Sequence, residues 1–205
     1  MEPEPTTAHR PPWPHAPPHW GAQSGIYRVT AATYHHERFF HTALDLDHLT
    51  STLLHNLAET QWTVRAWAVF PNHYHFLAQS PLQETGARSL PRLISKTHMQ
   101  AAKAINQRHN SPGRKVWHNY WESLITFEKS FFARLHYVNR NPEHHGFKRP
   151  AEHYRWCSAS WFAETAPRAF VHTVNSFKID RLHVPDVDCP VETDTPEPPK
   201  KQQHP

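Results

Sequence analysis

Hydrophobic and polar residues alternate along four short runs of the chain, as they do in half-buried strands. These runs are rich in β-branched and aromatic residues, which favours strand structure. The predicted strands are residues 26–33, 62–70, 73–79 and a run within 116–127 centred on 121–127. Pro71 and Asn72 separate the second run from the third, so these two strands are predicted to form a hairpin.

Apolar residues recur at helical spacing in three other segments. The first predicted helix begins near residue 45, where Asp45 or Asp47 can supply the N-terminal cap. The second spans 89–108 and carries basic residues on its polar side. The third spans 129–140 and is predicted to stop before Pro142, because the residue preceding a proline disfavours helical backbone.

The resulting order, strand-helix-strand-strand-helix-strand-helix, predicts an α+β, ferredoxin-like βαββαβ fold with a C-terminal helix. Its sheet is expected to be antiparallel, with helices on one face and the other face available as a platform. One domain is predicted over 25–165, and residues 166–183 are an extension that the pattern does not place. The Pro-rich leader 1–24 and the acidic, Pro-rich tail 184–205 are predicted to be disordered.

Composition and charge narrow the choice of function. No apolar run reaches eighteen residues, so no membrane span is predicted, and the N-terminus lacks the apolar core of a signal peptide. Cys157 and Cys189 lie far apart, which argues against a cysteine metal site and suits a reducing cytoplasm. Residues 88–155 hold thirteen Lys/Arg against four Asp/Glu, so a polyanion is the expected partner unless this is an ordinary solvated basic face.

The pair His73 and His75 is the first candidate for chemistry. Alternate side chains of a strand point to the same side, so the two imidazoles are expected to lie together and to share one divalent metal. The chain has twenty histidines, so a chance pair of surface histidines is the competing interpretation.

The segment FFARLHYVNRNP (131–142) is the second candidate. Tyr137 and Asn141 are four residues apart and Arg134 precedes Tyr137 by three, which places all three on one side of a helix. A phenol, an amide oxygen and a guanidinium there suit a phosphate. A tyrosine at the edge of the core is the alternative.

These two segments, taken together, resemble the REP-associated tyrosine transposases, relatives of the insertion-sequence transposases of the single-tyrosine HUH class. The resemblance rests on PNHYH within 66–79, on WHNYWESLI and YVNRNP within 113–146, and on YRWCSAS within 154–162. It covers about residues 26–162 and implies the same βαββαβ fold. Tyr74, His136 and Glu143 differ from the residues that members often carry, which leaves target specificity open.

Carried over position by position, the resemblance makes His73 and His75 metal ligands, Asn141 the third ligand and Tyr137 the nucleophile. The implied cofactor is a divalent metal, Mg²⁺ or Mn²⁺. The implied activity is nicking and rejoining of single-stranded DNA near repeat hairpins, through a 5′-phosphotyrosine intermediate, in the bacterial cytoplasm or nucleoid. A monomer and a homodimer both remain open.

DNA contacts are expected from basic and aromatic side chains. The predicted DNA-binding residues are Arg88, Arg92, Lys96, Lys103 and Arg134. Trp117, Tyr120 and Trp121 are candidates to stack on unpaired bases, with core packing as the alternative.

Three other functions compete with the nuclease. One is a catalytically silent, domesticated DNA-binding protein that recognises repeat hairpins. Another is a small metal hydrolase or cupin, disfavoured because five glycines supply few tight turns and an amidohydrolase barrel needs about 250 residues. The last is a histidine-rich metal buffer, which has no need of Tyr137.

Overall fold

The structure is a computed structural model that describes residues 23–82 and 86–178. The predicted tails therefore lie almost wholly outside the described residues. Four strands form one antiparallel sheet in the order β2-β3-β1-β4. They are β1 (Ile26–Thr33), β2 (Thr63–Val69), β3 (His73–Gln79) and β4 (Trp117–Ile125). The α+β fold with an antiparallel sheet is confirmed, and the fourth strand begins earlier than its predicted centre.

Five α-helices and three short 3₁₀ helices complete the described chain. The α-helices are α1 (Ala43–Glu59), α2 (Leu90–Arg108), α3 (Glu128–His144), α4 (Ala159–Thr165) and α5 (Arg168–Asn175). The 3₁₀ helices are η1 (Tyr34–His36), η2 (Gly86–Ser89) and η3 (Ala151–His153). No helix of the described residues is both long and apolar enough to cross a lipid bilayer.

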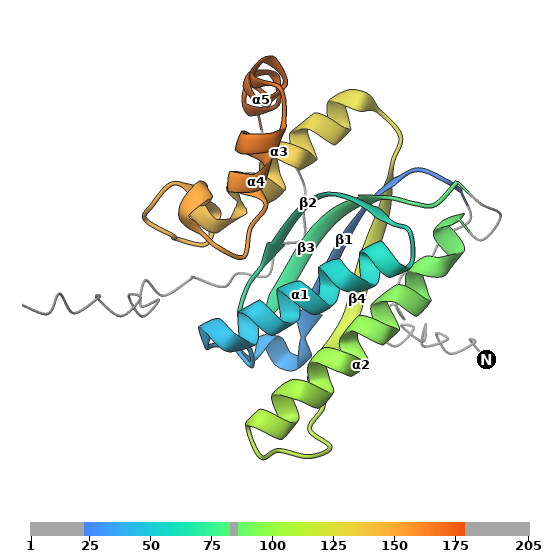
Figure 1. Ribbon diagram of the computed structural model, residues 1–205, viewed down its shortest axis with the longest axis vertical. Coiled ribbons are helices and arrows are strands. Elements are labelled where there is room, and N and C mark those ends of the chain that lie inside the picture. The colour runs from blue at the N-terminus through green and yellow to red at the C-terminus, as the bar shows by residue number, and fades with distance from the viewer. Residues whose placement is uncertain (1–22, 83–85, 179–205) are drawn as a thin grey trace, which may run out of the picture.

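The two long helices α1 and α2 lie side by side over one face of the sheet (Figure 1). Their buried sides contribute leucines such as Leu49 and Leu93 to the core. Tyr74 of β3 points to this helical face, because its hydroxyl is hydrogen-bonded to His98 of α2 at 2.9 Å. Strand side chains alternate between faces, so His73 and His75 point to the other face, where α3 packs against β2 and β3.

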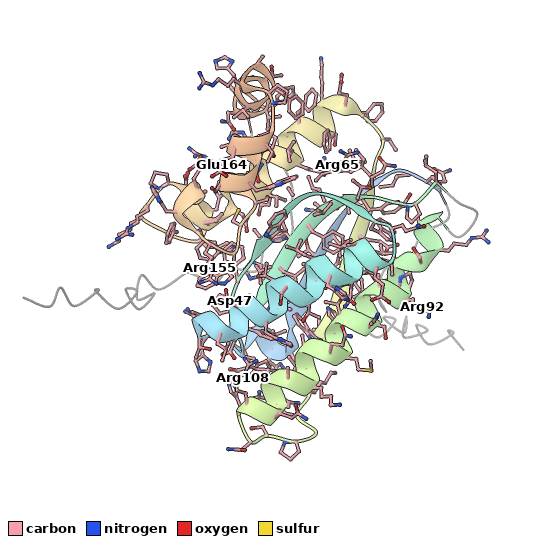
Figure 2. All side chains as sticks on the ribbon, in the orientation of Figure 1. Asp47, Arg65, Arg92, Arg108, Arg155 and Glu164 are labelled. Atoms are coloured by element: carbon pink, nitrogen blue, oxygen red, sulfur yellow. The ribbon has the colours of Figure 1, made fainter. Side chains whose placement is uncertain are left out.

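The start of α1 differs from the predicted cap. Thr42 is the N-cap, and its hydroxyl accepts from the Asp45 amide at 3.2 Å while the Asp45 carboxylate accepts from the Thr42 amide at 3.1 Å. Asp45 is thus the third helical residue of a capping box, in which the side chain of each residue accepts a hydrogen bond from the backbone N–H of the other residue. Asp47 instead accepts from Arg155 and Trp156, at 2.8 and 2.9 Å (Figure 2).

The outer edge of β2 is covered by the segment that contains Trp156, Cys157 and Ser158. The Val69 amide donates to Trp156 at 2.9 Å, and the Ser158 amide donates to Trp67 at the same distance. The Ser158 hydroxyl also bonds the Asn139 side chain of α3 at 2.6 Å. This segment therefore closes an exposed strand edge and fixes α3 on the sheet.

The prediction that the last helix ends before Pro142 is wrong, because α3 continues to His144 with Pro142 buried inside it. A proline has no N–H, so the carbonyl of Val138, four residues earlier, loses its helical donor. The Cys157 thiol lies 3.6 Å from that carbonyl oxygen and donates to it. A contact from a distant segment thus replaces the missing bond and lets the helix pass the proline.

Helix α4 ends the predicted domain 25–165, and the extension that the sequence pattern left unplaced contains α5. Phe170 of α5 contacts Phe132 of α3 and Phe162 of α4, with ring centroids 5.5 and 5.9 Å apart. The His136 ring of α3 bonds the Phe177 carbonyl at 2.7 Å. The extension therefore packs on the outer side of α3 and stabilises the helix that carries Tyr137.

Candidate active site

His73 and His75 lie next to each other on the face of the sheet opposite α1 and α2. Their ring centroids are 5.0 Å apart, and both side chains are buried. The structure therefore brings the sequence-predicted pair together on one face, as the alternation of a strand requires.

Hydrogen bonds fix the orientation of both rings. Nδ1 of His73 lies 2.7 Å from Asn72 Oδ1, while the Asn72 amide nitrogen donates to the His36 carbonyl at 3.1 Å. An amide oxygen only accepts, so His73 carries its proton on Nδ1 and keeps a lone pair on Nε2. Nδ1 of His75 is held in the same way by the Thr30 hydroxyl at 2.8 Å. Outer contacts of this kind orient the histidine ligands of metals.

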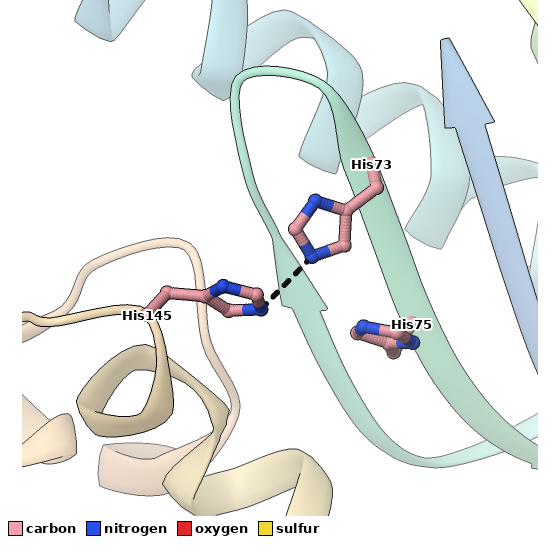
Figure 3. A group of neighbouring side chains, drawn as sticks. All are labelled: His73, His75 and His145. Atoms are coloured by element: carbon pink, nitrogen blue, oxygen red, sulfur yellow. Dashed lines mark hydrogen bonds between the residues drawn. The ribbon is translucent and has the colours of Figure 1, made fainter. Parts of the chain in front are cut away.

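A third histidine, which the sequence analysis missed, completes the cluster. Nε2 of His145 lies 3.1 Å from Nε2 of His73, and their ring centroids are 4.7 Å apart (Figure 3). The three buried histidines each offer a nitrogen, and these atoms lie within 4.8 Å of one another, close enough to hold one metal ion. The interval of four residues from Tyr137 to Asn141 to His145 was the available signal, because it places all three on one side of a helix.

Burial favours the neutral form of His73 and of His75. Loss of hydration, and then the charges of His75 and His145, hold the pKa of His73 well below its usual 6.5. Burial likewise depresses the pKa of His75, with His145 and Arg28 adding to the effect. Neutral imidazole is the form that binds metals, so His73 and His75 are in a ligand-competent state near neutral pH.

Tyr137 of α3 lies between the histidine cluster and His144. Its ring meets the His75 ring edge-on at 6.1 Å and stacks on the His144 ring at 5.5 Å. The Tyr137 hydroxyl is shielded from solvent and has no hydrogen-bond partner among the described residues. The phenol ring therefore contacts the His75 imidazole, but a phosphodiester reaches its oxygen only after the side chain or α3 moves.

Asn141 lies one helical turn after Tyr137 and one turn before His145. It is fully buried, and neither atom of its side-chain amide has a partner in the described part of the chain. A buried polar group without a partner costs about 1–3 kcal/mol. Unsatisfied groups on both Asn141 and Tyr137, beside three buried imidazoles, fit a site that takes a cation and an oxyanion.

The predicted DNA-binding residues fall on two sides of the molecule. Arg134 lies on α3 one turn before Tyr137, and its guanidinium bonds Ser130. Arg88 lies in η2, and Arg92, Lys96 and Lys103 lie on α2, which covers the opposite face of the sheet (Figure 1). Lys96 is already paired with Glu59 at 2.7 Å. These four residues therefore do not share a site with Tyr137.

The three aromatic candidates also separate. Trp117 is buried and stacks on His98 with centroids 4.2 Å apart, so it is part of the core under α2. Tyr120 lies on the same helical face, opposite Ala31. Trp121 is half-buried and lies opposite Thr30, on the histidine face.

A second group, His41, Asp45 and His109, also gathers potential metal ligands among the described residues. Here the Asp45 carboxylate is already used by the Arg108 guanidinium and by the Thr42 amide. A cation at this group must therefore compete with a guanidinium for the Asp45 carboxylate.

Comparisons with known proteins give a likeness of fold. No protein-family model matches the chain, and no curated protein matches it. Among solved structures, the chain is similar to a REP-associated tyrosine transposase bound to a REP hairpin, with 15% sequence identity, a TM-score of 0.53 and coverage of 70% of this chain and 81% of that one. It is also similar to a putative transposase from Deinococcus radiodurans, with 16% identity over 57% of this chain and 89% of that chain, but the TM-score of 0.41 is too low to support an argument. The first likeness confirms the fold that the sequence resemblance implied.

Proposed function

We propose that this protein is a transposase-type enzyme of the single-tyrosine HUH class, which nicks and rejoins single-stranded DNA at or near a hairpin. The observation that carries the proposal is the Tyr137 ring packed against His75, which belongs to a cluster of three buried histidines. The fold shared with a hairpin-bound transposase supports DNA as the partner.

The residues of this cluster suit a divalent cation. His73 and His75 would hold it through imidazole nitrogens, with Asn141 supplying an amide oxygen as the sequence predicted. When bound, such a cation polarises the scissile phosphate and offsets the charge that develops in the transition state.

Tyr137 supplies the nucleophile. A free phenol has a pKa of about 10, so a tyrosine nucleophile needs activation at neutral pH. Attack by the phenolic oxygen forms an O–P bond and breaks the bond from phosphorus to the 3′ oxygen, which takes up a proton and leaves as a 3′-hydroxyl. The phenolic proton passes to solvent or to a neighbouring base. The 5′-phosphotyrosine retains the energy of the phosphodiester, so the step can reverse and join strands.

One observation favours a second function, a catalytically silent DNA-binding protein. The Tyr137 hydroxyl is closed to solvent and has no hydrogen-bond partner in the described chain. A permanently closed phenol would leave the fold able to bind a hairpin and unable to cut it.

The experiment that separates the two functions is covalent trapping. The full chain is incubated with a labelled single-stranded hairpin and Mn²⁺, then resolved under denaturing conditions. We expect a protein–DNA adduct that Tyr137→Phe abolishes and Tyr34→Phe retains, because Tyr34 is a half-buried tyrosine outside the histidine cluster. Hairpin binding without an adduct would establish the silent binder, and neither binding nor adduct would refute both functions.

A further inference from the structure

We propose that His145 completes a three-imidazole site, so that the cation bound at this cluster is a transition-metal ion and not magnesium. The inference deepens the proposed metal-dependent function and rests on it. It concerns the identity of the ion, which neither the sequence pattern nor the likeness of fold specifies.

The distances between the ring nitrogens fit shared coordination. Nε2 of His73 and Nε2 of His145 are 3.1 Å apart. Two imidazoles bound to one ion at about 2.0–2.1 Å place their nitrogens roughly 2.8–3.4 Å apart, for bond angles between 90° and the tetrahedral angle. The nitrogen of His75 lies within 4.8 Å of both. One ion can therefore be reached by all three rings with small adjustments of the side chains.

His145 is fixed in place by its surroundings. Its backbone amide donates to the Asn141 carbonyl at 3.1 Å, which continues the helical hydrogen bonding past Pro142. Its ring and that of His73 each lie 4.6 Å from the Phe70 ring. The side chain is buried, with 6% of its surface exposed. The position of His145 thus depends on the same continuation of α3 that the Cys157 contact allows.

The chemistry of the donors selects the ion. Magnesium prefers oxygen ligands in a near-ideal octahedron and keeps several waters. Imidazole nitrogens favour zinc, iron, nickel and copper, with manganese at the weak end of the series. A site of His73 and His75 with an amide oxygen would tolerate magnesium, so His145 is the residue that shifts the preference.

The first test uses the unmodified full chain without DNA. Chelator-stripped protein is titrated with Co²⁺, Zn²⁺, Mn²⁺ and Mg²⁺ by calorimetry, and Co²⁺ binding is also followed by its visible absorption. We expect one tight site for Zn²⁺ and Co²⁺, and Mg²⁺ binding at least about a hundredfold weaker, as the preference of imidazole for transition metals requires. Magnesium binding as tight as that of manganese or zinc would overturn the inference.

The second test removes the third ring. His145→Ala and His145→Asn are compared with His153→Ala, which alters an exposed histidine in η3. Circular dichroism establishes that each variant is folded. We expect both His145 variants to lose at least about tenfold in Zn²⁺ and Co²⁺ affinity, since even outer contacts of a ligand contribute that much, with a smaller change for Mg²⁺. Folded His145 variants with wild-type affinity would refute a ligand role, and if they do not fold, the selectivity of the unmodified chain decides.

Failure of this inference is distinguishable from failure of the proposed function. Tyr137-dependent adduct formation with a site that prefers magnesium would leave the nuclease standing and remove the role of His145. A site selective for zinc or cobalt, with no adduct formed, would support the role of His145 and refute the nuclease.

Discussion

At the scale of single residues, the orientation of the histidine cluster depends on side chains that are not themselves candidate metal ligands. The Thr30 hydroxyl lies 2.8 Å from Nδ1 of His75, and Thr30 faces His75 directly across the β1–β3 pairing. The hydroxyl holds one ring nitrogen and so directs the other toward the cluster. Replacing it with a methyl group removes that constraint at nearly constant volume.

We therefore expect Thr30→Val to weaken metal binding by about 10–100-fold, the usual effect of losing an outer contact of a histidine ligand. Calorimetric titration of the stripped protein with Co²⁺ or Mn²⁺ measures the change. Thr63→Val on the exposed end of β2 is the matched control. Equal affinities of the two variants would mean that packing alone orients His75.

His98 provides a prediction about pH and stability. Its ring stacks on Trp117 and bonds the Tyr74 hydroxyl, and loss of hydration lowers its pKa from 6.5 to about 3. The folded state therefore keeps His98 neutral at pH values where the unfolded chain protonates it. Between about pH 6.5 and pH 3 the unfolded state binds one more proton at this site, so stability is lost as the pH falls.

The expected contribution of His98 is about 1.4 kcal/mol of unfolding free energy per pH unit in that window. Urea unfolding from pH 7.5 to 4.5 measures the slope for the wild type and for His98→Gln. For His98→Gln, the slope of unfolding free energy against pH should be smaller by the amount that one bound proton contributes, whatever the absolute stability of the variant. Parallel slopes would show that the ring is protonated in the folded protein.

Residue types and spacing predicted part of this site. His73 and His75 were identifiable because strand alternation alone brings them together. Tyr137 and Asn141 were identifiable as one side of a helix, although their roles remain predictions. His145 escaped because the helix was expected to end before Pro142, and a residue beyond a helix end has no defined side.

At the scale of elements, the continuation of α3 past Pro142 depends on one distant thiol. Cys157 is buried and lies 3.6 Å from the carbonyl oxygens of both Val138 and Asn139. Burial raises the pKa of this thiol to about 12, so it is a weak nucleophile at neutral pH. Its role is to satisfy the helix, and its chemistry is suppressed.

We expect Cys157 to resist alkylation in the folded protein. The measurement uses Cys189→Ser protein, so that Cys157 is the remaining cysteine of the two in the chain, with iodoacetamide followed by mass spectrometry. Modification should be slow under native conditions and fast in denaturant. Rapid native modification would show that the 156–158 segment detaches from the β2 edge.

The long helices and the strands could be predicted from the spacing of hydrophobic residues, because each of these elements has one clearly apolar face. All four strands and the first two helices were predictable in this way. The later elements were less so. Helices α4 and α5 are seven and eight residues long and bury few side chains, so their apolar pattern is too short to distinguish from a loop. The bond that carries α3 past Pro142 comes from a residue fifteen positions beyond that proline, and no local pattern contains it.

At the scale of the whole molecule, the sheet separates two candidate surfaces for DNA. The histidine cluster, Tyr137 and Arg134 occupy one face, while Arg88, Arg92 and Lys103 are exposed on the side covered by α1 and α2. One phosphate cannot contact both groups. If the α2 side binds DNA, it holds a part of the strand or hairpin distant from the scissile bond.

This separation predicts different effects on binding and on chemistry. Arg88→Gln with Arg92→Gln should weaken hairpin binding. The slope of the logarithm of the binding constant against the logarithm of salt concentration should fall in magnitude by about one for each phosphate contact that is lost. The rate of adduct formation at saturating DNA should stay unchanged, because neither side chain lies on the face of Tyr137. Arg134→Gln should lower that rate at saturating DNA, because Arg134 precedes Tyr137 by one helical turn on the same element.

Lys96→Gln is the matched control for the α2 side, since Glu59 already neutralises that charge at 2.7 Å. An exposed ion pair contributes little to stability, so its loss should alter neither folding nor the salt slope by a measurable amount. Binding and adduct rates are obtained from the same titrations at several salt concentrations. Slower adduct formation by the Arg88→Gln, Arg92→Gln variant at saturating DNA would contradict this separation. In that case the DNA would have to pass around the edge of the sheet and contact both of its faces, because neither arginine lies on the face of Tyr137.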